Sequence, residues 1–252
     1  MRLLPALLAA GTLLMTATPA HAWQVTWLGH AGFLVEAKDG TRVLIDPWLG
    51  GPTYPKGYQL PEKIDAILVS HGHFDHASSA TELSKRFKAP VVGVFELASL
   101  LAPQGGPEPI GGNIGGTFQI KGIKASLIPA VHSSSTSGED GKPQYAGTPA
   151  GFVLEAAGEP TLLHAGDTGL TKDYEAVAKT FKPKIAMLPI GGHFTMDPKQ
   201  AAIAAGYLGV KDVIPMHYGT FGLLKGTPAA LREAGPGLRV HSLKIGEAAS
   251  IK

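Results

Sequence analysis

A cluster of three histidines and one aspartate directly after an apolar run constrains this chain more than any other feature. Residues 70–76 read Ser-His-Gly-His-Phe-Asp-His and follow the apolar run Ala66–Val69. A short continuous apolar run predicts a strand buried on both faces. The carboxyl end of such a strand is where an α/β sheet usually presents its functional residues. The segment therefore predicts an α/β fold with a site at this strand end.

The residue types in this loop suit metal ions. In an extended turn, His71 and His73 point to the same side, whereas Asp75 and His76 come after a bend and face a second point nearby. One loop can therefore hold two adjacent cations, and zinc, manganese, iron and nickel all accept nitrogen and oxygen ligands. The alternative is that these residues only cap a following helix. In that case three imidazoles serve no purpose, and burying them unpaired is costly.

Two metals need more ligands than one loop supplies, and three later segments each place a ligand-type residue after an apolar strand. These residues are His132, Asp167 and His217. A single histidine of this kind is usually structural. Three successive strand ends of the same form favour metal ligation instead.

Strand and helix patterns alternate along the chain. Helices are predicted at Ala77–Phe87, Lys172–Phe181 and Pro198–Leu208, the last with Asp197 as its N-cap and Gly209 as its C-terminal stop. The predicted strands are Trp23–Leu28, Phe33–Ala37, Arg42–Ile45, Ala66–Val69, Val91–Phe95, Ile123–Pro129, Gly151–Glu155, Pro160–Leu163, Ile185–Leu188 and Val213–Ile214.

Composition excludes several classes of protein. The chain has no cysteine, which rules out a disulfide framework, thiolate zinc ligands and a cysteine nucleophile. Its net charge of +2 gives no sign of a nucleic-acid partner. The 33 glycines and 20 prolines predict many turns, and residues 102–116 are predicted to be a loop or tight hairpin.

The first 22 residues have the pattern of a cleaved export signal. Arg2 precedes the apolar run Leu3–Met15, and a small-x-small cleavage site lies at residues 20–22. The run is shorter than the roughly 20 residues that span a membrane, although an uncleaved anchor or a buried helix is an alternative. We expect a periplasmic or secreted protein in which residues 23–252 form a single domain without a membrane span.

Taken together, these motifs resemble the metallo-β-lactamase superfamily, and within it the UPF0173 group of metal-dependent hydrolases. That group is similar to ascorbate-phosphate lactonases and to the phospholipase D that cleaves N-acyl phosphatidylethanolamine. The resemblance covers about residues 23–252, and the export signal departs from many relatives. Besides the residues already named, it rests on the motifs Trp27-Leu-Gly-His-Ala-Gly, Leu44-Ile-Asp-Pro-Trp, Leu188-Pro-Ile-Gly-Gly-His-Phe-Thr-Met-Asp-Pro and Pro215-Met-His-Tyr-Gly-Thr-Phe.

The resemblance implies a four-layer αβ/βα sandwich with the site at one end, between two central sheets. It also implies two divalent metal ions, with zinc or manganese favoured over iron or nickel, and a nucleophilic hydroxide held between them. Asp75 would also orient the attacking water. The implied ligands are His71, His73 and His132 for the first metal, Asp75, His76 and His217 for the second, and Asp167 bridging both.

Three further residues belong to the resembling motifs. His30 and His193 lie in glycine-flanked turns, where we expect them at the mouth of the site. There they would contact a phosphate or carbonyl oxygen or protonate the leaving group, and the alternative for each is a turn residue bonded to backbone. Asp46 ends a strand and is expected to accept the free N–H of a ligand histidine.

The implied function is hydrolysis of an ester-type bond, a phosphodiester or a lactone, in a small molecule or a lipid head group. Alternatives are an exported β-lactamase or thioesterase, a mononuclear iron oxygenase, and a metal-binding protein without activity. Lactamases of the superfamily generally lack the bridging aspartate, and an oxygenase would normally lack a complete second ligand set. Loops at 48–61, 102–116 and 133–149 would set specificity, with Trp48, Tyr54 and Tyr58 lining substrate or filling core. The sequence also allows a homo-oligomer.

Overall fold

Two seven-stranded sheets form the centre of the molecule in the computed structural model, which describes residues 22–138 and 140–252. The predicted signal peptide therefore lies, apart from Ala22, outside the described residues. The first sheet has the order β16 (Ala248–Ile251), β1 (Trp23–Trp27), β2 (Phe33–Glu36), β3 (Arg42–Ile45), β4 (Ala66–Leu68), β5 (Val91–Val94) and β6 (Ile110–Gly112). The second has the order β15 (Arg239–Val240), β14 (Asp212–Met216), β13 (Ile185–Pro189), β12 (Leu162–His164), β11 (Ala150–Ala156), β8 (Ile123–Pro129) and β7 (Thr117–Ile120).

The two sheets follow the same plan of strand pairing. In the first, strands β16 to β3 pair antiparallel and strands β3 to β6 pair parallel. In the second, strands β7 to β12 pair antiparallel and strands β12 to β15 pair parallel. The parallel half of each sheet gathers several strand carboxyl ends at one edge, where ligands bind in α/β folds.

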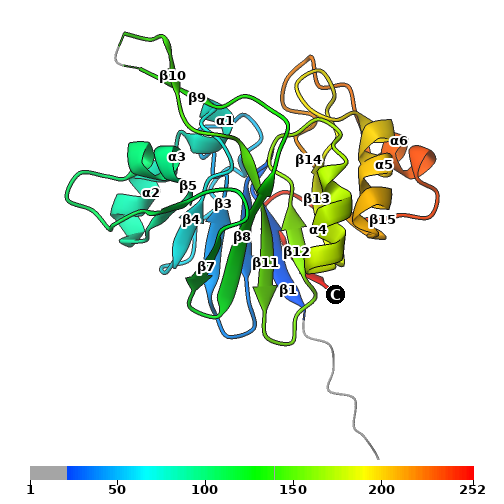
Figure 1. Ribbon diagram of the computed structural model, residues 1–252, viewed down its shortest axis with the longest axis horizontal. Coiled ribbons are helices and arrows are strands. Elements are labelled where there is room, and N and C mark those ends of the chain that lie inside the picture. Colours follow the sequence, from blue (N-terminus) through cyan, green and yellow to red (C-terminus); the bar gives the residue numbers. More distant parts are fainter. Residues whose placement is uncertain (1–21, 139) are drawn as a thin grey trace, which may run out of the picture.

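Helices cover the outer faces of both sheets (Figure 1). On the first sheet they are α2 (Ala80–Phe87) and α3 (Phe95–Leu101), and on the second α4 (Asp173–Phe181), α5 (Pro198–Leu208) and α6 (Pro228–Ala234). The short helix α1 (Phe74–Ala77) instead contacts residues 135–137. The result is the predicted four-layer αβ/βα sandwich, which is confirmed. None of the helices in the described ranges is long and apolar enough to cross a membrane.

Side chains from the two sheets meet in one core. The Trp23 indole donates to the carbonyl of Pro160 at 2.7 Å, and the Phe33 ring lies 5.6 Å from that of His164. The predicted strand at Ala66–Val69 is fully buried, as its apolar sequence indicated. This burial places the histidine loop that follows it at the end of the core rather than on an outer surface.

The clearest local prediction was α5, whose bounds and caps are as expected. Asp197 accepts from the Gln200 amide in a capping box, and Gly209 ends the helix in the left-handed region. The helix predicted at Ala77–Phe87 is instead two helices. It begins earlier, at Phe74, and breaks at Ser78–Ser79, where the Ser79 hydroxyl accepts from the Leu49 amide.

Several short strands and helices were not predicted from the sequence. Residues 102–116 form neither a plain loop nor a hairpin, because Ile110–Gly112 pairs parallel with β5 as β6. Periodicity cannot mark a strand of this length, and its glycines follow from packing, since a Cβ on Gly111 would lie 3.0 Å from the Phe95 Cα. The other unpredicted elements are α3, α6, β7, β15, β16 and the hairpin of β9 (Ser135–Ser137) and β10 (Pro143–Tyr145).

Two glycines provide a matched test of the packing. Gly206 lies exposed in α5 with nothing near a new Cβ, whereas a Cβ on Gly151 of β11 would lie 2.7 Å from the His164 carbonyl oxygen. Gly206→Ala should raise the free energy of unfolding by about 0.5–1 kcal/mol. Gly151→Ala should lower it by about 1–3 kcal/mol. Urea unfolding of both variants measures this, and equal shifts would contradict the packing described.

Candidate metal centre

The seven predicted metal ligands come together at one end of the two sheets. Five of them follow the carboxyl ends of β4, β8, β12 and β14, and the other two, Asp75 and His76, lie within the short helix α1. Within the described residues, their donor atoms and those of His30 form three groups, each with all donor atoms within 4.8 Å of one another. The groups are His71 with His73 and His132, then His30 with Asp75, His76 and His217, and then His71 with His76 and Asp167.

Asp167 lies at the centre of this arrangement. Its carboxylate is buried, and its Oδ2 lies within 4 Å of imidazole nitrogens from both the first and the second group. The distances are 2.9 Å to His217, 3.4 Å to His76, 3.6 Å to His132 and 3.9 Å to His71, each to Nε2. One carboxylate therefore links histidines of the first sheet to histidines of the second.

The first group has the dimensions of a zinc ligand set. His71 Nε2 and His73 Nδ1 are 3.0 Å apart, and the two rings stand nearly perpendicular at 79°. Nitrogens bound tetrahedrally at about 2.0–2.1 Å lie about 3.3 Å from each other. The His132 ring lies 5.0 Å from the His71 ring and completes the group.

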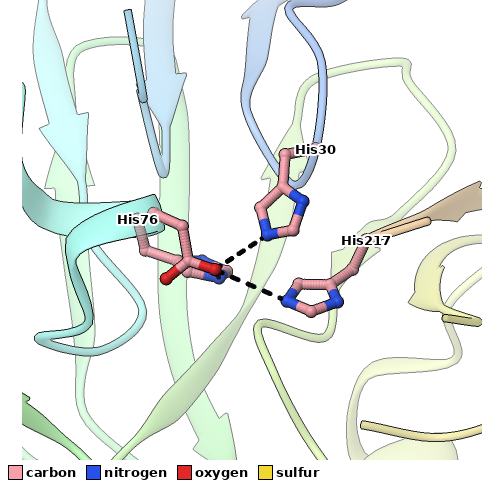
Figure 2. A group of neighbouring side chains, drawn as sticks. His30, His76 and His217 are labelled. Atoms are coloured by element: carbon pink, nitrogen blue, oxygen red, sulfur yellow. Dashed lines mark hydrogen bonds and ion pairs between the residues drawn. The ribbon is translucent and has the colours of Figure 1, made fainter. Parts of the chain in front are cut away.

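The second group surrounds the Asp75 carboxylate. Its Oδ2 lies 2.9 Å from His30 Nε2, 3.8 Å from His217 Nε2 and 3.9 Å from His76 Nε2. Figure 2 shows the rings of His30, His76 and His217 directed toward one another from three separate segments of the chain.

His30 is not at the mouth of the site, where we expected it. The residue is 1% exposed, and its ring lies 4.0 Å from that of His217. Its Nδ1 is 2.8 Å from the hydroxyl of Thr220, a residue that the sequence analysis missed. Thr220 lies three residues after His217, within the motif Pro215-Met-His-Tyr-Gly-Thr-Phe that supported the resemblance.

Asp46 lies beneath the centre, bonded to a ligand histidine as its strand-end position suggested. Its Oδ2 lies 2.8 Å from His76 Nδ1, and the same carboxylate accepts the amide and hydroxyl hydrogens of Ser70. The Ser70 oxygen is in turn 3.0 Å from His71 Nδ1. Because that hydroxyl donates to Asp46, it accepts from His71, so both rings direct Nε2 to the centre. Ser70 was another residue that the sequence analysis missed.

Burial and buried carboxylates set the charge of these groups. Burial lowers the pKa of His71 well below its ordinary value. Burial also acts to lower the pKa of His217, but Asp167 outweighs it and raises that pKa to about 9. Asp167 and Asp46 likewise hold the pKa of His76 well above its usual range. The buried carboxylates therefore favour positive charge at His76 and His217, and a bound metal cation could supply that charge in place of the histidine protons.

Two structural observations fit bound cations. Among the described buried atoms, His76 Nε2 and Asp167 Oδ1 have no hydrogen-bond partner, although leaving buried polar atoms unpaired is costly. His30, Asp46 and His217 have positive φ angles of 51°, 45° and 55°, a conformation that costs non-glycine residues about 1–2 kcal/mol each. Strain of this kind gathers at functional sites.

A cavity of about 540 Å³ opens beside the clustered donors. His73, Asp75 and His217 line it, together with aromatic and aliphatic side chains. His193 is exposed and, in the part of the chain described, is not among the lining residues, although its neighbour Phe194 is. The structure therefore does not bring His193 into the metal groups.

The aromatic residues of the loop at 48–61 divide between cavity and core. The Trp48 ring lies 5.5 Å from both the His30 and the Phe74 rings, beside the cavity. Tyr54 and Tyr58 are partly buried and pack against the hydrophobic core instead.

Known proteins are similar to this chain in sequence and in fold. The profile of a "Beta-lactamase superfamily domain" matches residues 24–217. A "UPF0173 metal-dependent hydrolase" of Myxococcus xanthus is 52% identical over 230 residues, covering 88% of this chain and 81% of the relative. One from Anaeromyxobacter sp. is 47% identical over 220 residues, covering 84% and 80%. Igni18, described as a novel metallo hydrolase from Ignicoccus hospitalis, is 33% identical in sequence, with a TM-score of 0.80 and coverage of 92% and 99%.

The raised histidine pKa values predict how metal affinity depends on pH. A pKa of about 9 means that His217 keeps its proton in the metal-free protein up to about pH 9, and a metal must displace that proton. Apparent zinc affinity should therefore rise by at least about tenfold per pH unit from pH 7 to 9 and level off above. Chelator competition measures it, and levelling near pH 7, as for ordinary histidines, would contradict the raised values.

Proposed function

The chain belongs to the metallo-β-lactamase superfamily, within its UPF0173 group of metal-dependent hydrolases, and we propose that it is a two-metal hydrolase of ester-type bonds. The bond is a phosphodiester or a lactone in a small molecule or a lipid head group. The observation that carries the proposal is Asp167, whose Oδ2 lies within 4 Å of histidine nitrogens from both the first and the second donor group. A carboxylate between two ligand groups suits a pair of cations better than one.

The donor chemistry favours zinc or manganese in both positions. Two such cations would lower the pKa of a shared water and polarise the oxygen of the bond under attack. We propose that one is held by His71, His73 and His132, the other by Asp75, His76 and His217, and that Asp167 contacts both. Asp46 and Ser70 would hold the rings of His76 and His71 in register.

Asp75 and His30 are proposed to act as a pair. The neighbouring His217 and His30 outweigh the effect of burial and keep the pKa of Asp75 well below its usual range, so it is ionised and can accept a hydrogen bond from the attacking water. Burial lowers the pKa of His30 to about 4, so its neutral ring can donate Nε2–H to Asp75 and orient it. His193, next to the cavity wall, is proposed to contact the leaving group at the rim.

A panel of three substrates tests the proposal. The mature chain, residues 23–252, would be loaded with zinc or manganese and assayed on bis(4-nitrophenyl) phosphate, δ-valerolactone and nitrocefin. We expect metal-dependent cleavage of the phosphodiester or the lactone. Rapid cleavage of nitrocefin alone would instead make the protein a β-lactamase, and cleavage that persists after chelation would contradict a metal-dependent reaction.

A pair of aspartate variants tests the role of Asp167 in the same assays. Asp167→Asn should lower turnover by at least about 100-fold, because replacing even an outer partner of a ligand typically costs 10–100-fold. Its metal content should also fall. Asp173→Asn changes an exposed carboxylate at the start of α4 and should alter neither. Two metals and full turnover in Asp167→Asn would remove Asp167 from the centre.

We also propose, from residues 1–22 alone, that the protein works in the periplasm or outside the cell. Their order of basic, apolar and small residues supports export with cleavage after Ala22. Sequencing the amino terminus of the protein isolated from a bacterial host should give Trp23 as the first residue. An amino terminus at Met1 in a cytoplasmic fraction would overturn this proposal.

A further inference from the structure

The cavity beside the candidate metal centre has an apolar wall that metal binding does not require. Its volume of about 540 Å³ falls in the range of small-molecule sites. Apart from the proposed ligands, its lining includes Phe74, Phe194, Phe221 and Leu223. These side chains come from α1, from the loop after β13 and from the loop after β14, so three separate segments build the wall.

Most of this wall is exposed to solvent. Phe74 is 60% exposed, Leu223 54% and Phe194 48%, and they are three of the nine large hydrophobic side chains exposed among the described residues. Single exposed hydrophobic residues are ordinary, but several that converge on one cavity indicate a contact surface. Covering them with an apolar group gains free energy in proportion to the area removed from water. Proposed metal ligands line the same cavity. A substrate whose apolar group covers the wall would therefore also lie beside the candidate metal centre.

Part of the wall is held in place before anything binds. The Trp48 ring lies 5.5 Å from the Phe74 ring and 5.8 Å from the Phe221 ring. Gly51 is required beside it, because a Cβ there would lie 2.8 Å from the indole. A preformed aromatic surface loses little conformational freedom on binding, so most of its burial contributes to affinity.

The charge of the cavity lining indicates that a bound substrate carries no anionic group on this side. No lysine or arginine lines the cavity within the described ranges, and its ionised side chains there include Asp75 and Asp167. Recognition of a phosphate or carboxylate normally uses arginine or lysine. A second anionic group on the substrate, away from the bond held by the metals, would find no partner on this wall.

We propose that the substrate is neutral away from the reacting bond and carries an apolar alkyl or aromatic group that packs against Phe194, Phe221 and Leu223. This inference rests on the proposed hydrolytic function, because it names the group carried beside the bond. It favours a lactone or ester with an apolar substituent over a phosphodiester with polar head groups.

Two lactones of the same ring size test the apolar group. The metal-loaded protein should have a kcat/KM for δ-decalactone, which carries a pentyl chain, about tenfold or more above that for δ-valerolactone. Phe194→Ala and Leu223→Ala should each reduce this preference by at least about threefold, because each removes part of the wall. Phe95→Ala removes an even more exposed phenylalanine on α3, outside the cavity lining, and should keep the preference. Equal kcat/KM for the two lactones would overturn the inference.

Calorimetry with neutral amides separates the two proposals. Hexanamide should bind the metal-loaded protein about tenfold or more tightly than acetamide, and more tightly than 6-hydroxyhexanamide, whose chain has a polar end. If neither a lactone nor bis(4-nitrophenyl) phosphate is cleaved but hexanamide is preferred, the proposed reaction is wrong and the apolar subsite stands. If lactones are cleaved but hexanamide binds no better than acetamide, the reaction stands and the apolar subsite is wrong.

Discussion

Buried carboxylates among buried histidines are the interaction on which this end of the molecule depends. Asp46, from the first sheet, bonds His76, and Asp167, from the second, reaches His76 and His217. Buried charges are stable only when paired, so these contacts hold the strand ends of the two sheets against each other. The geometry of the whole centre depends on how the two sheets pack.

The shared pairing plan of the sheets explains why strand ends supply most of these groups. In each sheet both halves contribute to the packed core, and the parallel half brings several carboxyl ends to one edge. Side chains at these ends leave regular hydrogen bonding, which allows the positive φ angles of Asp46 and His217. The framework is thus rigid where the donors must be placed accurately.

The candidate metal donors and the apolar cavity wall lie in different parts of this structure. Five of the seven proposed donors are buried, and His73 and His132 are half-buried, so their arrangement tolerates little variation. The cavity wall comes largely from exposed side chains such as Phe194 and Leu223, on loops that the sheets hold in place. Loops can change without disturbing the donors, which is how one fold serves many substrates.

The sequence alone determined the buried strand before the histidine loop and the caps of α5, because these depend on local periodicity and on end residues such as Asp197 and Gly209. The four-layer fold was predicted through the resemblance of the motifs to a known superfamily. The sequence also singled out His132, Asp167 and His217 through their positions after apolar strands. Only the tertiary structure decided that His30 packs behind Asp75, that Ser70 joins Asp46 to His71, and that His193 stays outside the donor groups. Such contacts depend on how segments distant in the sequence pack together, and local sequence patterns carry no record of that packing.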